Sequence, residues 1–138
     1  MSWDISICKF SRDYVRIEDI PNDERTLVLG EASAVRDAIS KHFPNTDWSD
    51  PAWGVFDAPF GSIEFSMGPA QQQLEGFMLH VRAGEEILPP IIELCLAEGW
   101  QALDCSNSEF LEKARVPEAG LHKWLQYRDR VLATGGSA

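Results

Sequence analysis

Several features that would point directly to a function are missing from this sequence. Its 138 residues contain no apolar run close to the ~20 residues that a membrane-spanning helix needs, so we expect no membrane insertion. The N-terminal "MSWDISICKF" has neither a basic start nor a long apolar stretch, which predicts that it is not a signal peptide. The phosphate loops GxGxxG and GxxxxGK[ST] and the GxSxG of serine hydrolases are also absent. No nucleotide-binding or hydrolase function can therefore be argued from a motif.

Cysteine is scarce and irregularly spaced. The chain has three cysteines, Cys8, Cys95 and Cys105, which is an odd number, and they form no CxxC pair. This pattern is typical of reduced thiols in a cytosolic protein, so we expect no disulfide and a cytoplasmic location. Asp104-Cys105-Ser106, at the end of a predicted strand, is the best candidate for a reactive thiol, and a partly buried, unreactive cysteine is the favoured alternative.

Metal-ligand patterns are weak as well. The three histidines fall on three different predicted elements without an HxH or HxxxH pair, so we expect no zinc site. The loop "NTDWSDPAWG" contains the carboxylates of Asp47 and Asp50, but it lacks the DxDxDG pattern and the final glutamate of an EF-hand. We interpret it as a turn in which these carboxylates accept local N–H groups, rather than as a calcium loop. We therefore expect no metal and no other cofactor.

Basic residues are few compared with acidic ones. The chain has 22 acidic and 12 basic residues, which gives a net charge of −10. The imbalance is concentrated in residues 51–100, where seven acids accompany a single base, Arg82. Repulsion between this charge and phosphate groups predicts that the protein binds no nucleic acid. An acidic surface can attract a basic protein partner, and it can also serve solubility alone.

Hydrophobic periodicity predicts an α+β fold in one domain over residues 1–138. Five segments alternate or are short and apolar, as strands do, and three have helical periodicity. The resulting order, β-α-β-β-β-α-β-α, predicts a mostly antiparallel sheet with the helices packed on one face. The predicted elements are strands at 2–10, 52–58, 62–68, 76–82 and 100–105, helices at 31–43, 83–99 and about 117–133, a loop at 69–75, a core over 2–111 and a frayed tail at 134–138.

Alternation in the third and fourth predicted strands determines their register. Pairing Phe65 with Leu79 turns the apolar side chains of both strands inward, whereas a slip of one residue would turn them outward. The same register places Glu64 opposite His80 and near Arg82 on the open face of the sheet. We interpret this patch as a binding site, or as an acid–base pair in which Arg82 holds an anion. Ordinary cross-strand charge pairing is the alternative.

The strand before this pair extends the same surface. If Phe56 pairs with Ile63, Trp53 lies on the open face beside the charged groups, a combination that is typical of interface hot spots. The preceding loop then forms the rim of that face. The predicted partner-binding residues, with no catalytic residue among them, are Trp48, Asp50, Trp53, Asp57, Glu64, His80 and Arg82.

Several segments carry a resemblance to known proteins. They are "SWDI", "DIP", "SDPAWG", "SIEFSMG", "FMLHVRAG" and "LCLAEGWQALDCSNSEF", all within residues 2–111. Together they resemble a group of small bacterial cytoplasmic proteins, mostly without an assigned activity, to which the helix after Val116 looks like an addition. In size, acidity and compact α+β design the chain is also similar, more generally, to immunity proteins of bacterial toxin systems. That similarity implies binding to a cognate toxin domain and blockage of its active site.

Three functions remain open from the sequence. We expect a non-enzymatic acidic binding protein, of the immunity type, that binds a toxin or effector domain and is a monomer or a weak homodimer. The alternative is a small enzyme or small-ligand-binding domain that uses the open face around Glu64, His80 and Arg82. The third is a homodimer subunit that buries this face.

Overall fold

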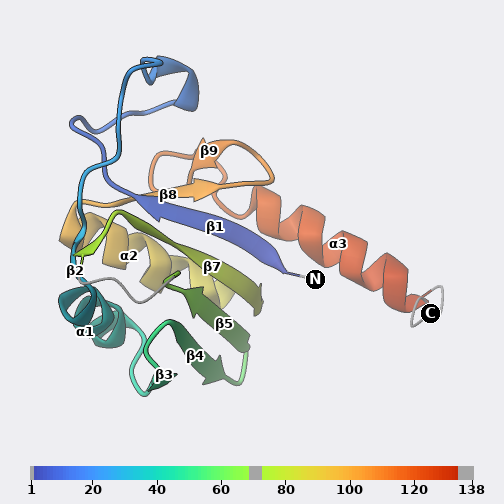
Figure 1. Ribbon diagram of the computed structural model, residues 1–138. Coiled ribbons are helices and arrows are strands. Elements are labelled where there is room, and N and C mark those ends of the chain that lie inside the picture. Colours follow the sequence, from blue (N-terminus) through green and yellow to red (C-terminus); the bar gives the residue numbers. More distant parts are fainter. Residues whose placement is uncertain (1, 69–72, 134–138) are drawn as a thin grey trace.

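The computed structural model describes residues 2–68 and 73–133. Its largest element is a seven-stranded sheet in which every paired strand is antiparallel to its neighbours, in the order β3-β4-β5-β7-β1-β8-β9 (Figure 1). This confirms the predicted α+β class with a mostly antiparallel sheet. The strands of this sheet are β1 (Trp3–Cys8), β3 (Asp47–Asp50), β4 (Trp53–Ala58), β5 (Gly61–Ser66), β7 (Gly76–Ala83), β8 (Gln101–Asp104) and β9 (Glu109–Phe110).

The helices follow the predicted periodicity. Val35 and Ile39 of the first helix and Leu94 of the second are buried in the core against the sheet. Pro89 and Pro90 occupy the first turn of the second helix, and Gly99 ends it in the left-handed conformation with φ 73°, both as predicted. The remaining elements are η1 (Ile17–Asp19), β2 (Gly30–Glu31), α1 (Ala32–His42), β6 (Gln73–Leu74), η2 (Glu85–Ile87), α2 (Leu88–Glu98) and α3 (Ala119–Ala133).

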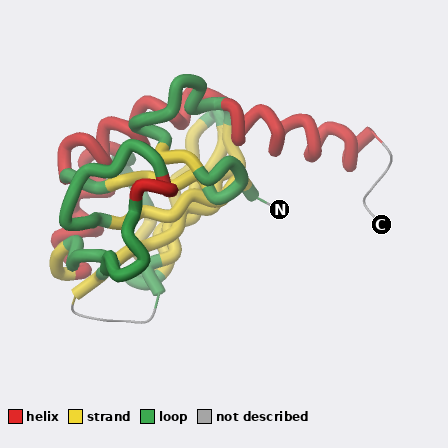
Figure 2. Tube along the Cα trace, turned by 90° about the horizontal axis from the view of Figure 1, so that it is seen from above, coloured by secondary structure: helices red, strands yellow, loops and turns green. Residues whose placement is uncertain are grey.

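The two faces of the sheet have different environments. Helices α1 and α2 gather on one side of the strands, and α3 extends away from the body (Figure 2). The inward side chains of the central strands are buried, and the outward ones are partly exposed, because successive residues of a strand point to opposite faces. We call the outward side the open face; its residues are Asp4, Ser6, Trp53, Val55, Asp57, Ser62, Glu64, Ser66, Met78, His80 and Arg82.

One end of the outward side is covered. The segment after β1 folds back over β8 and β9, where the ring of Phe10 makes edge contacts with Tyr14 and Phe110. The side chain of Gln101 accepts a hydrogen bond from the backbone N–H of Tyr14 and donates one to its carbonyl oxygen. The open face is therefore confined to β4, β5, β7 and the first half of β1.

Three short strands and the exposure of one side chain differ from the predictions. Residues 47–50, predicted as a loop, form the edge strand β3, and residues 109–110 form β9. Gln73–Leu74, within the predicted loop, form β6, which pairs with β2. Strands this short have no period of their own, so only their pairing defines them. Leu132, predicted to face the body, is 69% exposed because α3 leaves the body. The predicted loop at 69–72 and tail at 134–138 lie outside the described residues.

Trp48 is held on the inner side of the sheet by an unusually close approach to Gly54. A Cβ atom added at Gly54 would lie 2.6 Å from the Trp48 ring, which is closer than van der Waals contact. The ring also neighbours Phe65, and its Nε1 donates to the Ser40 hydroxyl at 3.0 Å. Glycine at this position thus allows β3 to close over the edge of the core.

We expect Gly54→Ala to lower the free energy of unfolding by ~1–3 kcal/mol, because the added methyl group must displace the Trp48 ring. The matched control is Gly84→Ala, whose methyl group would meet only the movable carboxylate end of Glu86 and should cost less than ~0.5 kcal/mol. Urea unfolding followed by circular dichroism measures both. Equal stabilities for the two variants would contradict this account of the Trp48 contact.

Candidate functional site

Two neighbouring strands bring His80 and Asp4 together on the open face. Asp4 on β1 lies opposite His80 on β7, and Nδ1 of His80 is 2.8 Å from Oδ1 of Asp4. The predicted register is correct on the other side as well, because Glu64 on β5 also lies opposite His80. The ring nevertheless hydrogen-bonds to Asp4. Alternation with the apolar Trp3 and Ile5 turns Asp4 outward, but nothing in the sequence signals that β1 is the neighbour of β7.

Glu64 pairs instead with Arg82. Nη1 of Arg82 donates to Oε1 of Glu64 at 2.9 Å, diagonally across β5 and β7. The side chain of Glu64 is 30% exposed and that of Arg82 is 39% exposed, so this is a partly solvated ion pair. The predicted Glu64–His80–Arg82 patch is therefore brought together, but as a Glu64–Arg82 ion pair beside a hydrogen bond between His80 and Asp4.

Trp53 covers the histidine. The Trp53 and His80 rings are stacked, with centroids 5.7 Å apart and planes inclined by 20°. Trp53 lies opposite Ser66, which lies opposite Met78, so the indole crosses a small serine to reach β7. Despite this contact, Trp53 remains 38% exposed. An aromatic ring thus stands over the charged groups with one side available to solvent.

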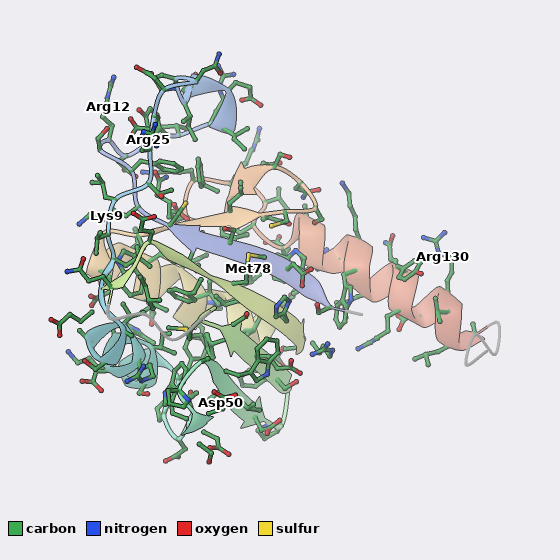
Figure 3. The ribbon with its side chains drawn as sticks, viewed as in Figure 1. Lys9, Arg12, Arg25, Asp50, Met78 and Arg130 are labelled. Atoms are coloured by element: carbon green, nitrogen blue, oxygen red, sulfur yellow. The ribbon has the colours of Figure 1, made fainter. Side chains whose placement is uncertain are left out.

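The other predicted site residues are distributed unevenly. Asp57 shares the open face, opposite Ser62, and is exposed. Asp50 lies at the rim, opposite Trp53, where its carboxylate accepts the backbone N–H of Ala52 at 2.9 Å (Figure 3). Trp48 lies on the inner side and does not join them. Asp47 lies opposite the outward Val55, so alternation within β3 turns Trp48 inward, and the register shift that follows returns Asp50 to the outward side. The sequence analysis treated these residues as a loop and had no alternation to apply.

The carboxylates of residues 45–54 make local hydrogen bonds. The Asp47 carboxylate accepts from both the backbone N–H and the hydroxyl of Ser49, and these bonds hold its pKa below the ordinary 3.8. Asp50 bonds within its own turn as described above. Among residues 2–68 and 73–133, no three histidine, cysteine, aspartate or glutamate side chains are grouped to hold a metal ion. The loop is a structured strand edge.

The candidate reactive thiol has an unfavourable environment. Cys105 is an exposed free cysteine, but partial burial of its sulfur raises the pKa, and the negative charges of Asp4 and Asp104 raise it further. Burial, together with the nearby Glu112, raises the pKa of Cys8 to about 11. Neither environment favours the thiolate form, which is the nucleophile.

Asp104 is an important residue that the sequence analysis did not identify as structural. It is 1% exposed, and its Oδ1 accepts the indole N–H of Trp3 at 3.0 Å and two donors from Ser106. Gly120 allows α3 to begin directly against it, since a Cβ atom there would lie 2.0 Å from Oδ2 of Asp104. The sequence signal for this structural role of Asp104 is its position as a polar residue at the end of an apolar strand.

The Asp4 carboxyl has a shifted pKa. Partial burial raises it, but the hydrogen bonds from Ser2 and His80 and the positive charge of Arg82 lower it more, so the pKa lies below the ordinary 3.8. The charged form of Asp4 is thus favoured by folding. The open face therefore retains the Asp4 charge in mildly acidic solution.

Comparisons with known proteins provide no relative from which a function could be inferred. No protein-family model, no curated protein and no solved structure matches the chain. Within the described residues, no helix has both the length and the apolar character required to cross a membrane.

We expect Asp104→Ala to destabilise the protein by ~2–3 kcal/mol, because it leaves the buried Trp3 indole N–H without its acceptor. The control Asp23→Ala, at an exposed position, should change stability by less than ~0.5 kcal/mol. Thermal and urea unfolding measure the difference, and an Asp104→Ala protein as stable as the control would contradict the assigned role.

The Asp4–His80 pair predicts a dependence of stability on pH. Because the folded-state pKa of Asp4 is lowered, its contribution is present above about pH 3.8 and is lost as the pH falls through the lowered value. We expect Asp4→Asn to cost ~0–1 kcal/mol near neutral pH and to cost nothing once the carboxyl is protonated. Unfolding of the variant, of the wild type and of a control, Asp57→Asn, across acidic pH measures this. A difference that does not shrink with acid would refute it.

Proposed function

We propose that this protein is an acidic, non-enzymatic binding module whose open face docks onto a basic protein domain, in the manner of an immunity protein that neutralises a cognate bacterial toxin. The observation that carries the proposal is Trp53, which stands 38% exposed on a polar sheet face and is stacked on His80. Exposed aromatic rings among charged groups are the residues that dominate binding energy at protein interfaces.

The site is organised before any partner arrives. Hydrogen bonds hold Asp4 to His80 and Glu64 to Arg82, and the stacked Trp53 ring is fixed against the histidine. Side chains that are already ordered lose less conformational entropy on binding, so more of the contact energy is retained as affinity. The strands beneath them are central in the sheet, which makes the surface a rigid one.

The charge of the site favours a basic partner. The open face carries the carboxylates of Asp4, Asp57 and Glu64 against the single guanidinium of Arg82, and the whole chain has a net charge of −10. A field of this sign increases the rate of encounter with a positively charged domain and repels acidic proteins and nucleic acids. A toxin that cleaves or binds nucleic acid through a basic active site is a partner of this kind.

A second candidate function is supported by the Asp4–His80 hydrogen bond. A carboxylate on Nδ1 orients an imidazole so that Nε2 can accept a proton, which is the arrangement of a general base. Among the described residues, no serine or cysteine is hydrogen-bonded to His80, so water or a substrate group would have to act as the nucleophile. If this is the function, His80→Gln abolishes turnover of a substrate while leaving its binding nearly unchanged.

The hot-spot prediction concerns Trp53 and Arg82. Immobilised protein is used to isolate a stoichiometric partner from extract of its own cells, and affinity is then measured by calorimetry. We expect Trp53→Ala and Arg82→Ala each to weaken binding by ~2 kcal/mol or more. Tyr127→Ala removes another exposed aromatic ring, on α3, and should leave the affinity unchanged. Wild-type affinity in both open-face variants would refute this surface as the binding site.

Association with that partner should slow as salt is added. Surface charges act over about 8–10 Å at physiological ionic strength, and additional salt shortens this range. We expect the association rate constant to fall by at least about tenfold between low and high salt, with a smaller change in the dissociation rate constant. Stopped-flow measurements follow both. A rate constant that is constant across the salt range would show that charge does not guide the encounter.

A further inference from the structure

Helix α3 has a second surface without a role in the proposed function. Its first turns pack on the body, where Gly120 and Leu121 are buried. Beyond Leu125 the helix leaves the body, and Figures 1 and 2 show it extending into solvent. Its 15 residues correspond to ~22 Å, a length at which an isolated helix is only marginally stable in water. Leu132 in the outer half is 69% exposed, so little apolar burial stabilises this end of the helix.

An apolar stripe runs along one side of α3 and continues into its outer half. Leu121 and Trp124 of the inner half pack against the core, and Val131 and Leu132 follow them at helical spacing, with Leu132 69% exposed. The indole N–H of Trp124 is buried and finds no acceptor among the described residues. A large apolar side chain this exposed on a projecting helix is typical of a surface that binds another protein element.

The charge of α3 is opposite to that of the rest of the chain. The helix carries three basic residues and one acidic residue, whereas the whole chain has a net charge of −10. Arg128 lies over the Trp124 ring at 5.4 Å, and Arg130 projects from the outer half of the helix (Figure 3). Arg128 also forms an ion pair with the neighbouring Asp129 at 3.2 Å. Both arginines therefore lie on the part of α3 that carries the apolar stripe.

A surface with the complementary properties lies at the root of the same helix. A groove of about 560 Å³ has an apolar floor of Leu88, Pro89 and Ile92 on α2 and an acidic rim of Glu85, Glu93 and Glu118. Within this rim, Glu85 is bonded to His122 of α3. The groove and the stripe of one molecule are at opposite ends of α3, so one chain cannot bring them together. Two chains can do so.

We propose that the occupant of the groove is α3 of a second copy of this chain, in a two-fold dimer. Antiparallel pairing of the two α3 helices places the outer half of each beside the root of the other. Each stripe then covers the partner's apolar groove, and Arg128 and Arg130 face the acidic rim. Both complementary contacts are formed twice in one closed interface, as two-fold symmetry requires. The open face stays free, so this dimer is distinct from one that buries Trp53.

Analytical ultracentrifugation across the micromolar concentration range tests the dimer. We expect a mass of about twice the 15.5 kDa of one chain at high concentration. Leu132→Asp should weaken dimerisation at least about tenfold, because it places a charge in the apolar contact. The matched control is Leu96→Asp, which alters a 65% exposed leucine of α2 outside the groove and should leave the dimer intact. Circular dichroism verifies that both variants remain folded.

Charge exchange provides a second test. Arg128→Glu alone should weaken dimerisation at least about tenfold, and adding Glu93→Arg should restore part of the loss, because the opposite charges face each other again. Three outcomes would overturn the proposal: a single-chain mass at all concentrations, a dimer that is equally stable in Leu132→Asp and Leu96→Asp, and a dimer that Trp53→Ala dissociates. Added salt should also weaken the dimer.

Discussion

The position of β1 between β7 and β8 is the constraint on which both faces of this protein depend. Its inward residues Trp3, Ile5 and Ile7 lie at the centre of the core, and its outward Asp4 reaches His80 on the neighbouring strand. At the other edge of the strand, the indole of Trp3 donates to the buried Asp104, which also marks the place where α3 begins. The N-terminal strand therefore connects the core, the candidate site and the root of the C-terminal helix.

The open face combines polar side chains that are paired with one another and an aromatic ring, Trp53, that is partly exposed to solvent. Its Arg82–Glu64 ion pair and its His80–Asp4 hydrogen bond are partly solvated and contribute little to stability individually, about 0–1 kcal/mol each. They do restrict the side chains beneath Trp53, so a partner meets an ordered surface. The net negative charge and the exposed indole have separate roles, because the charge affects the rate of encounter and the indole affects the lifetime of the complex.

The chain presents two surfaces of opposite character at different places. The open face is acidic and lies over the middle of the sheet, whereas the outer half of α3 is basic and apolar and projects from one end. Because the groove is on α2, on the helix-covered side of the sheet, and the open face is on the other side, self-association through α3 and partner binding through Trp53 are compatible. A dimer of this form would present two open faces and could bind two partner domains.

The sequence by itself determined the fold class, the inward and outward sides of the long strands and the register of β4, β5 and β7. These follow from the two-residue period and short connections, since a slip would expose apolar residues such as Phe65. Only the tertiary structure decided that His80 bonds to Asp4, because β1 and β7 are far apart in sequence. It also decided the inner position of Trp48, through the pairing of β3 with β4, and the exposure of Leu132. The pairing of strands that are distant in the sequence, β-bulges and the direction of a terminal helix depend on tertiary packing. The hydrophobic periodicity of a single segment does not contain that information.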